Sequence, residues 1–203
     1  MVTRREVETL VLPALEASRG LGFLGPGPVV RHVEHAWPLV TALPAAGLIA
    51  DLGSGGGVPA LILVLACPGT RWLLIESHHR RATWLQAAAA ELGVADRVEL
   101  HEGRAEDVGR GLRRGSAAAV TARSFARPCV TAECGAPLLA PGASLWVAEP
   151  PKRTPTRWPA APLAELGLHL GGGVPGWAEL LLAQACPDRY PRRVGIPAKR
   201  PLF

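Results

Sequence analysis

The sequence lacks any hydrophobic run long enough to cross a membrane. A transmembrane helix needs about 18 to 20 consecutive, predominantly apolar residues, and no stretch of this chain approaches that length without a charge. The amino-terminal stretch MVTRREVETL also lacks the continuous apolar segment of a signal peptide. These absences favour a cytoplasmic protein with no membrane partner.

Cysteine is scarce, and its spacing excludes the common metal sites. The chain has four cysteines, with no CxxC pair and no partner histidines at zinc spacing, at positions Cys67, Cys129, Cys134 and Cys186. We therefore expect buried, reduced thiols and no bound metal. Reduced thiols agree with a cytoplasmic location.

Acidic residues are missing from the last part of the chain, RYPRRVGIPAKRPLF (189–203). Its cations are Arg189, Arg192, Arg193, Lys199 and Arg200. The other 188 residues carry 17 charges of each sign, so the whole net charge of +5 lies in this segment. A localised excess of this kind predicts a polyanionic partner, such as a nucleic acid, that these five cations would contact. The alternative is that Tyr190, Leu202 and Phe203 anchor the tail and leave its charges solvated.

What is present is enough apolar residues for one substantial core. With 48% hydrophobic content in 203 residues, we expect one main domain over 46–188, between an N-terminal helical cap over 1–45 and the basic tail over 189–203. Within the cap, apolar spacing predicts a helix over 3–18 with a break or kink at Pro13, and a second helix over 29–43 interrupted near Pro38.

From residue 47 onward, strand-like and helix-like segments alternate. Apolar runs of strand length lie at 48–51, 72–76, 97–101, 117–122 and 144–149, with helical stretches between them. This alternation predicts an α/β fold with a mostly parallel sheet covered by helices on both faces. The segments LGLHL (166–170) and WAELLLAQA (177–185) would add an antiparallel pair. The resulting seven-stranded plan resembles the class I, Rossmann-like S-adenosylmethionine-dependent methyltransferases.

The stretch DLGSGGGVPAL follows the first predicted strand and places Asp51 just before a glycine loop. Glycines at 53, 55 and 57 allow a tight turn and let bare backbone approach a ligand at the carboxyl end of the strand. The D-x-G-x-G-x-G order is similar to S-adenosylmethionine sites, in which the acid faces the amino-acid part of the cofactor. A dinucleotide site and a purely structural turn are the alternatives.

Two further acidic positions follow the next strands. Glu76 ends RWLLIES, 25 residues after Asp51, where a carboxylate can accept both hydroxyls of a ribose. Taken alone, an acid at a strand end is equally consistent with a surface residue. After the third predicted strand, GRAEDV places Ala105 and Glu106 where they would border the adenine. The amino group of the adenine would be recognised by the Glu106 carboxylate or by a nearby backbone amide.

These segments resemble the bacterial 16S ribosomal RNA guanine-N7 methyltransferases, also called glucose-inhibited division protein B. The resemblance runs from about residue 47 to the end, with a weaker match at RHVEHA (31–36). TARSFARP and the basic tail are the most specific matches, whereas the glycine loop is shared with many methyltransferases. Glu149 in WVAEPPK stands where members of that family commonly have a lysine.

The resemblance implies an enzyme that binds S-adenosylmethionine and acts on 16S rRNA or the small ribosomal subunit. The implied cofactor-binding residues, together with the loop positions Asp51 and Gly55, are Gly53, Val58, Glu76, Ser77, Ala105, Glu106 and Arg123. Methylating guanine N7 removes no proton, so no general base is expected, and Arg123 is the candidate for electrostatic positioning. We expect a monomer.

Three functions remain open on the sequence alone. An rRNA methyltransferase accounts for the localised cations of the tail. A methyltransferase of the same fold acting on a small molecule or a protein would not need them. A cofactor-binding paralogue without turnover is the third reading, because Glu149 departs from the family pattern. Trp158, in a proline-rich stretch, is either a core residue or a platform for a stacked base.

Overall fold

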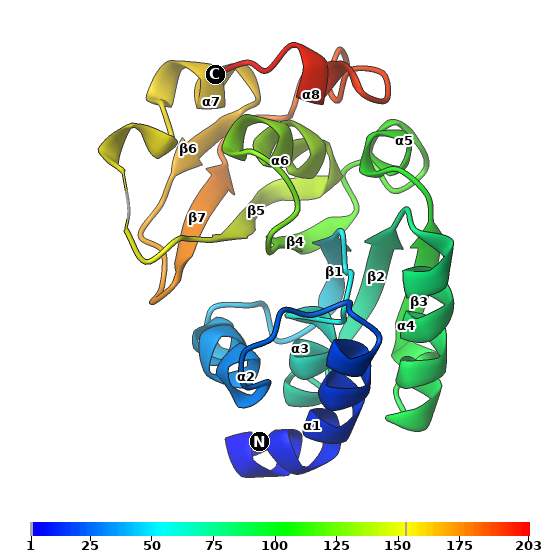
Figure 1. Ribbon diagram of the computed structural model, residues 1–203. Coiled ribbons are helices and arrows are strands. Elements are labelled where there is room, and N and C mark those ends of the chain that lie inside the picture. Colours follow the sequence, from blue (N-terminus) through cyan, green and yellow to red (C-terminus); the bar gives the residue numbers. More distant parts are fainter. Residues whose placement is uncertain (1, 153) are drawn as a thin grey trace.

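The computed structural model describes residues 2–152 and 154–203, and a seven-stranded sheet lies at its centre (Figure 1). The strand order is β3-β2-β1-β4-β5-β7-β6. Strands β3, β2, β1, β4 and β5 are parallel neighbours, whereas β7 runs antiparallel to both β5 and β6. The strands are β1 (Gly47–Leu52), β2 (Thr70–Glu76), β3 (Val98–Glu102), β4 (Ala117–Ala122), β5 (Leu139–Ala148), β6 (Leu168–Leu170) and β7 (Trp177–Leu182).

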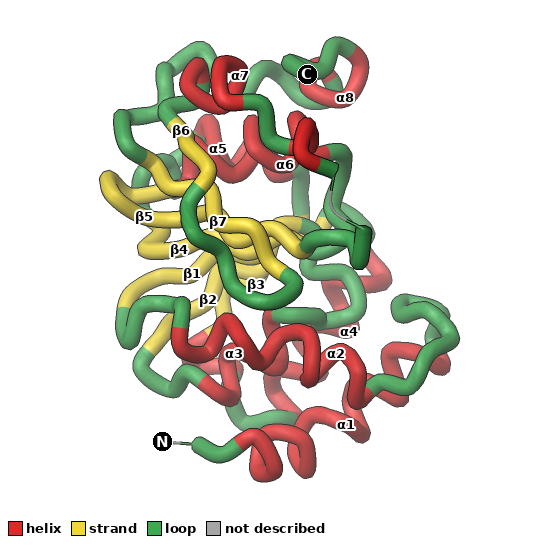
Figure 2. The backbone as a smooth tube through the Cα atoms, turned by 90° about the vertical axis from the view of Figure 1, so that its left-hand side faces the viewer, coloured by secondary structure: helices red, strands yellow, loops and turns green. Residues whose placement is uncertain are grey.

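Helices cover both faces of the sheet, as Figure 2 shows with the strands between two helical layers. Helices α1 to α4 lie on one side and α5 to α8 on the other. Their bounds are α1 (Arg4–Gly20), α2 (Val30–Ala36), α3 (Ala60–Ala66), α4 (His79–Glu91), α5 (Ala105–Arg110), α6 (Pro128–Gly135), α7 (Ala160–Glu165) and α8 (Ile196–Lys199). Short 3₁₀ turns occupy Trp37–Thr41, Ala95–Arg97, Ala136–Leu138 and Pro155–Arg157. The predicted α/β fold is confirmed.

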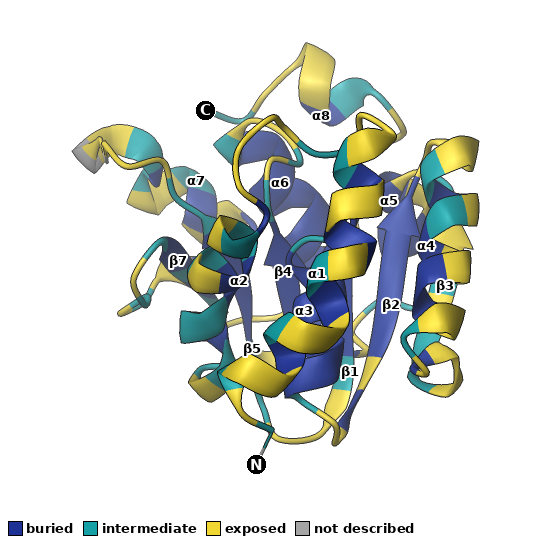
Figure 3. Ribbon diagram, turned by 60° about the horizontal axis from the view of Figure 1, so that its bottom comes forward, coloured by how far each residue is buried: buried dark blue, intermediate teal, exposed yellow. Residues whose placement is uncertain are grey.

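The central strands are apolar because both of their faces are buried. In β2, Trp72 and Leu74 pack into the core beneath α1 to α4, whereas Leu73 and Ile75 pack into the core beneath α5 to α8. All four are at most 1% exposed. Figure 3 shows the same contrast, with dark buried strands inside helices whose outer faces are exposed. A parallel sheet covered on both faces requires such continuous hydrophobic runs.

The amino-terminal cap is helical, with one departure from expectation. Helix α1 is continuous from Arg4 to Gly20, so the proline inside it, Pro13, does not break it. Its start is fixed by a capping box, in which Thr3 and Glu6 satisfy each other's backbone amides. Pro38, by contrast, does mark the change from α2 to a 3₁₀ turn. No helix in the described ranges is long and apolar enough to span a bilayer.

The sheet topology fixes where a ligand can bind. Chain order reverses between β1 and β4, which are hydrogen-bonded neighbours. In open α/β sheets the crevice at such a reversal, beyond the carboxyl ends of the strands, is where ligands bind. The loops that follow β1 and β4 carry the two predicted motifs, DLGSGGGVPAL and TARSFARP.

Candidate active site

The glycine loop after β1 is a left-handed turn tied to the end of β2. Gly53, Gly55 and Gly57 have φ of +64°, +53° and +85°, values that side chains with a Cβ rarely adopt. The Gly55 amide donates a hydrogen bond to Oε2 of Glu76 at 2.9 Å. The other oxygen of that carboxylate accepts from the His78 amide at 2.8 Å. The two loops are therefore held in one fixed arrangement by a single buried carboxylate.

Asp51, at the end of β1, is buried behind the loop and 1% exposed. Its Oδ1 accepts a hydrogen bond of 2.6 Å from the Thr121 hydroxyl of β4, which joins the two strands on either side of the crevice. Its Oδ2 has no hydrogen-bond partner among the described residues. Burial raises the pKa of Asp51 to about 7. Whether Asp51 also contacts the cofactor stays a prediction.

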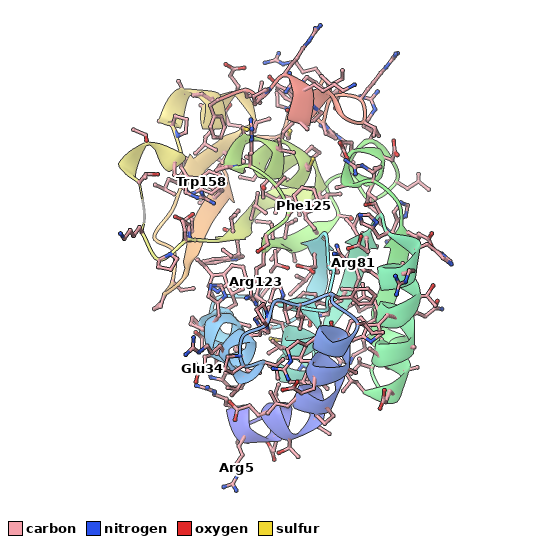
Figure 4. The ribbon with its side chains drawn as sticks, viewed as in Figure 1. Arg5, Glu34, Arg81, Arg123, Phe125 and Trp158 are labelled. Carbon is pink, nitrogen blue, oxygen red and sulfur yellow. The ribbon has the colours of Figure 1, made fainter. Side chains whose placement is uncertain are left out.

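The loop after β4 brings Arg123, Ser124 and Phe125 to the crevice, where Figure 4 shows Arg123 and Phe125. Ser124 has φ of +54° and is the non-glycine residue in the described chain with a positive φ. Strain of this kind is typical of functional loops. The Phe125 ring lies directly against Gly53, so close that a Cβ there would lie 2.7 Å from Cδ2 of the ring.

Arg123 is the centre of a polar cluster that includes the amino-terminal cap. Its Nη2 lies 2.7 Å from Nδ1 of His32 on α2, and its Nη1 is buried without a hydrogen-bond partner among the described residues. Burial lowers the pKa of Arg123, and the nearby Asp51 opposes that effect. Burial lowers the pKa of His32 to about 4, so its ring is neutral at pH 7.

Two cavities meet at Arg123 and Ser124. The first, which we call the loop cavity, has a volume of about 280 Å³. It is lined by Phe23, Leu24, Gly25, His32, Gly53, Ser54, Gly55, Gly56, Val58, Arg81, Arg123 and Ser124. The second, the β4–β5 cavity, has a volume of about 400 Å³, and its walls include Phe125, Val147, Glu149 and Arg157. A site for two reactants side by side is the arrangement that group transfer requires.

A third, small pocket of about 30 Å³ lies on the other side of Gly53, toward β2 and β3. Ser77, Ala105 and Glu106 line it, together with Phe125. The structure thus gathers the predicted cofactor-binding residues around Gly53. Gly55, Val58 and Arg123 lie on the loop-cavity side, and Glu76 is bonded to Gly55 between the two sides.

The comparisons with known proteins agree with this arrangement. A family model described as rRNA small subunit methyltransferase G matches residues 29–148. The ribosomal RNA small subunit methyltransferase G of Parasynechococcus marenigrum is 35% identical over 83% of this chain and 74% of its own length. The protein of that name from Syntrophomonas wolfei is 33% identical over 85% of each chain.

The chain belongs to the rRNA small subunit methyltransferase G family. The resemblance drawn from the loop motifs and the basic tail is thereby confirmed, and with it the predicted enzyme class.

Solved structures support the fold. Cofactor-bound Rv0187 from MTB matches with a TM-score of 0.62 at 18% identity, covering 91% of this chain and 99% of that one. An O-methyltransferase from Bacillus cereus, in complex with SAH, matches with a TM-score of 0.57 at 13% identity, covering 85% and 89%. At this identity the likeness concerns the fold alone, which is the predicted methyltransferase fold.

Glu106 lines the small pocket and also holds the basic tail. Its side chain is 3% exposed, and its Oε1 accepts a hydrogen bond from the amide of Gly195, in the tail, at 3.1 Å. Arg104 lies 3.6 Å from Oε2. The carboxylate holds the tail through Oε1, whereas Oε2 is buried with no hydrogen-bond partner among the described residues. Because Glu106 lines the small pocket beside Ala105, its contact with the adenine amino group stays a prediction. A backbone amide near Ala105 stays the alternative adenine contact.

The tail is anchored to the domain. Tyr190, Pro191 and Pro197 are buried, and Arg114 donates to the carbonyl oxygens of Cys186 and Tyr190 at 2.6 Å each. The tail is therefore anchored where it packs on α5 and α6, and its contact with RNA stays a prediction.

Arg192, one of the five cations, forms an ion pair within the protein. Its guanidinium binds the buried Glu133 carboxylate of α6 through two contacts of 2.8 and 2.6 Å, and its amide donates to the same carboxylate at 2.9 Å. A side chain engaged in this way anchors the tail, and its predicted contact with RNA stays a prediction. The side chains left exposed are those of Arg189, Arg193, Lys199 and Arg200.

Trp158 is a core residue, so its suggested role as a stacking platform is wrong. It is 7% exposed, and its indole Nε1 donates to Oε1 of Glu149 at 2.9 Å. The Arg157 Nε donates to the same oxygen at 2.9 Å. Glu149 therefore braces one wall of the β4–β5 cavity through two donors that follow it in sequence.

Sequence reasoning missed the role of α2. His32 and His35 are one turn apart in RHVEHA, and the first lines the loop cavity while the second lines the β4–β5 cavity. The three-residue spacing of the two histidines, which places them on the same helix face, was the signal available in the sequence for this role. It could not indicate Arg123 as a neighbour, because that residue lies 91 positions later.

Proposed function

We propose that this protein transfers the methyl group of S-adenosylmethionine to N7 of a guanine in 16S rRNA. The observation that carries the proposal is the pair of cavities sharing Arg123 and Ser124. One cavity is bounded by the glycine loop and the other opens at the ends of β4 and β5. Family membership supports the same activity, because the relatives are named for rRNA methylation.

The residues around Gly53 fit the cofactor. Each carboxylate oxygen of Glu76 accepts a hydrogen bond from one backbone amide. Each oxygen also has a second lone-pair site that can accept from a ribose hydroxyl. Ser77 and Ala105 form the small pocket that would border the adenine. On the other side of Gly53, His32 and Arg123 line the loop cavity, and each has a buried side-chain nitrogen without a hydrogen-bond partner among the described residues. The proposed cofactor site consists of Asp51, Gly53, Gly55, Val58, Glu76, Ser77, Ala105, Glu106 and Arg123.

The methyl transfer requires the two reactants to be positioned and requires no proton transfer. Bound S-adenosylmethionine supplies a methyl group on a positively charged sulfur. The N7 lone pair of guanine forms the new carbon–nitrogen bond as the carbon–sulfur bond breaks, and both electrons of the broken bond remain on sulfur. Since N7 carries no proton, the chain needs to supply approach geometry and a water-free cavity.

The β4–β5 cavity is the proposed place for the target guanine. Phe125 offers an apolar ring at its boundary with the glycine loop, where a base can stack. Ser124 in its strained conformation fixes the backbone between the two cavities. The exposed cations of the tail, Arg189, Arg193, Lys199 and Arg200, are the proposed phosphate contacts. They lie on a segment that the domain holds in place.

Several coarser expectations belong to the same proposal. We infer a cytoplasmic monomer whose partner is 16S rRNA or the small ribosomal subunit. We also infer a division into a cap over 1–45, a catalytic domain over 46–188 and a tail over 189–203.

The test is transfer of a labelled methyl group from S-adenosylmethionine to three substrates: naked 16S rRNA, small subunits, and large subunits as the control. We expect label in 16S rRNA, either naked or within the small subunit, and none in the large subunit. Label in neither form of 16S rRNA, from protein that binds the cofactor, would favour the paralogue without turnover. Label in a small molecule or protein instead would move the activity to that substrate class.

A further inference from the structure

Arg157 lies in the wall of the β4–β5 cavity, on the 3₁₀ turn Pro155–Arg157. Its side chain is 23% exposed, and its Nε donates to Oε1 of Glu149 at 2.9 Å. Glu149 follows the last residue of β5, and its side chain is only 4% exposed. A buried carboxylate therefore holds this arginine beside the cavity.

Trp158 supports the arrangement in two ways. Its indole Nε1 donates to the same oxygen of Glu149 at 2.9 Å, so that oxygen accepts from both residues. The guanidinium carbon of Arg157 also lies 5.4 Å from the centroid of the Trp158 ring, within the range of a cation–π contact. The guanidinium is thus held through its Nε and by a neighbouring ring.

The two terminal nitrogens of Arg157 are available to a ligand. Nη1 and Nη2 make no hydrogen bond among the described residues, and neither is one of the buried atoms that lack a partner there. Together they carry four of the five N–H donors of the guanidinium. Such a planar pair of donors suits an acceptor with two oxygens.

The chemistry of a guanosine nucleotide narrows the choice of acceptor. The O6 and N7 atoms of guanine form the pair that arginine most often contacts. In the proposed reaction, however, N7 must keep its lone pair for the incoming methyl group, so Arg157 cannot bind that pair. The phosphate is the other acceptor with two oxygens, and its negative charge strengthens the contact.

The size of the cavity agrees with this choice. Its volume of about 400 Å³ lies within the range of about 300 to 1,000 Å³ for pockets that hold whole small ligands. Phe125 and Arg157 both line it. The walls can therefore contact the base and the phosphate of one nucleotide.

We propose that Arg157, held by Glu149, binds the phosphate of the target nucleotide while its base lies in the β4–β5 cavity. The proposal rests on the proposed function, which places the guanine there. Arg157 is then an RNA contact inside the active site, separate from the cations of the basic tail.

The test compares two variants that differ only at Arg157. Arg157→Met alone would leave the buried Glu149 carboxylate without this cation, a change that can unfold a protein. The comparison is therefore between Glu149→Gln, which keeps Arg157, and the double variant Glu149→Gln with Arg157→Met. Glutamine removes the buried charge and keeps an oxygen that can accept from Trp158.

Arg71→Met is the control for the loss of one positive charge. Arg71 is exposed and lies near the amino-terminal end of β2, at the sheet edge opposite the cavity. Equilibrium binding to 16S rRNA is measured for each protein over a series of salt concentrations. Binding of S-adenosylmethionine and thermal unfolding are measured in parallel.

We expect the double variant to bind 16S rRNA about tenfold more weakly than Glu149→Gln. Its log–log salt slope should be flatter by roughly 0.7 to 0.9, the change for one lost phosphate contact. Arg71→Met should keep the wild-type slope. Binding of S-adenosylmethionine should stay within about twofold in every variant, because Arg157 does not line the loop cavity.

Two results would overturn the proposal. Equal salt slopes for Glu149→Gln and the double variant would show that Arg157 does not touch phosphate, and a lower affinity at equal slope would assign it to an uncharged acceptor such as O6 of guanine. A loss of S-adenosylmethionine binding as large as the loss of RNA binding would show that Arg157 only supports the cavity wall. Wild-type protein that binds 16S rRNA without methylating it would contradict the proposed function and leave the comparison of slopes intact.

Discussion

The Glu76 carboxylate accepts the amide hydrogen of Gly55 at 2.9 Å, across 21 positions of sequence. The residue predicted to hold the ribose therefore also shapes the loop that would cradle the rest of the cofactor. Since its second oxygen accepts from the His78 amide, the carboxylate faces a backbone donor on each side. A side chain at this position must offer two acceptors.

This geometry changes what is expected of the amide variant. Reasoning from the sequence predicts that Glu76→Gln costs less than Glu76→Ala, because an amide oxygen can still accept one bond. In the structure, the amide NH₂ would oppose either the Gly55 or the His78 amide. We expect Glu76→Gln to weaken cofactor binding by about 1 to 3 kcal/mol, comparable to Glu76→Ala.

Calorimetry with S-adenosylhomocysteine measures both variants, and circular dichroism controls for folding. Glu76→Gln with wild-type affinity would show that the two backbone contacts do not organise the site.

Asp51 predicts a pH dependence of stability. Its pKa in the folded protein is raised to about 7, mainly by burial, so between pH 4 and 7 the folded state binds more protons than the unfolded chain. The contribution of Asp51 is therefore most favourable below its unfolded pKa and is lost as the pH rises through about 7. An asparagine keeps an acceptor for Thr121 and has no charge to bury.

We therefore expect Asp51→Asn to gain stability relative to wild type as the pH rises from 4 to 8, by up to about 4 kcal/mol. Urea unfolding at several pH values measures this difference. A constant difference across the range would mean that Asp51 titrates normally in the folded protein.

Arg192 and Arg193 form a matched pair in the tail. Arg192 binds the buried Glu133, whereas the neighbouring Arg193 is exposed. Arg192→Ala leaves the Glu133 carboxylate buried without its cation, so we expect a loss of about 3 to 5 kcal/mol in stability. Arg193→Ala should change stability by less than about 0.5 kcal/mol.

Binding to 16S rRNA should show a different contrast. Arg193→Ala should flatten the log–log salt dependence by roughly 0.7 to 0.9, the change for one lost phosphate contact. Equal unfolding free energies for the two variants would contradict the anchoring role of Arg192. An unchanged salt slope for Arg193→Ala would show that this side chain does not touch phosphate.

Regular structure was largely predictable from the sequence. Buried parallel strands have continuous apolar runs, and for this reason β1, β2, β3 and β4 lie within about two residues of their predicted places. Strand β5 begins at Leu139, five residues before the predicted start. The prediction began too late because Pro141 and Gly142 are typical of a turn. Its pairing with β4 indeed has a register shift.

The tertiary pairing of charged groups was not predictable. A hydrophobic pattern indicates which face of an element is buried, but not which distant partner satisfies a polar group on it. Arg192 and Glu133 are 59 positions apart, and Gly195 and Glu106 are 89 apart. The sequence therefore could not indicate which polar groups anchor the tail, and two of these contacts fasten it to α5 and α6.

The most direct test of the central claim is the chemical identity of the product. The protein is incubated with S-adenosylmethionine and small subunits, and the 16S rRNA is then digested to nucleosides for mass spectrometry. A parallel sample is reduced with borohydride and treated with aniline, which cleaves RNA at N7-methylguanosine, and the site is mapped by primer extension. The account predicts 7-methylguanosine at a single position of 16S rRNA, absent when Glu76→Ala replaces the wild-type protein. A methyl group on any other atom or base, or no methylated nucleoside from protein that binds the cofactor, would contradict it.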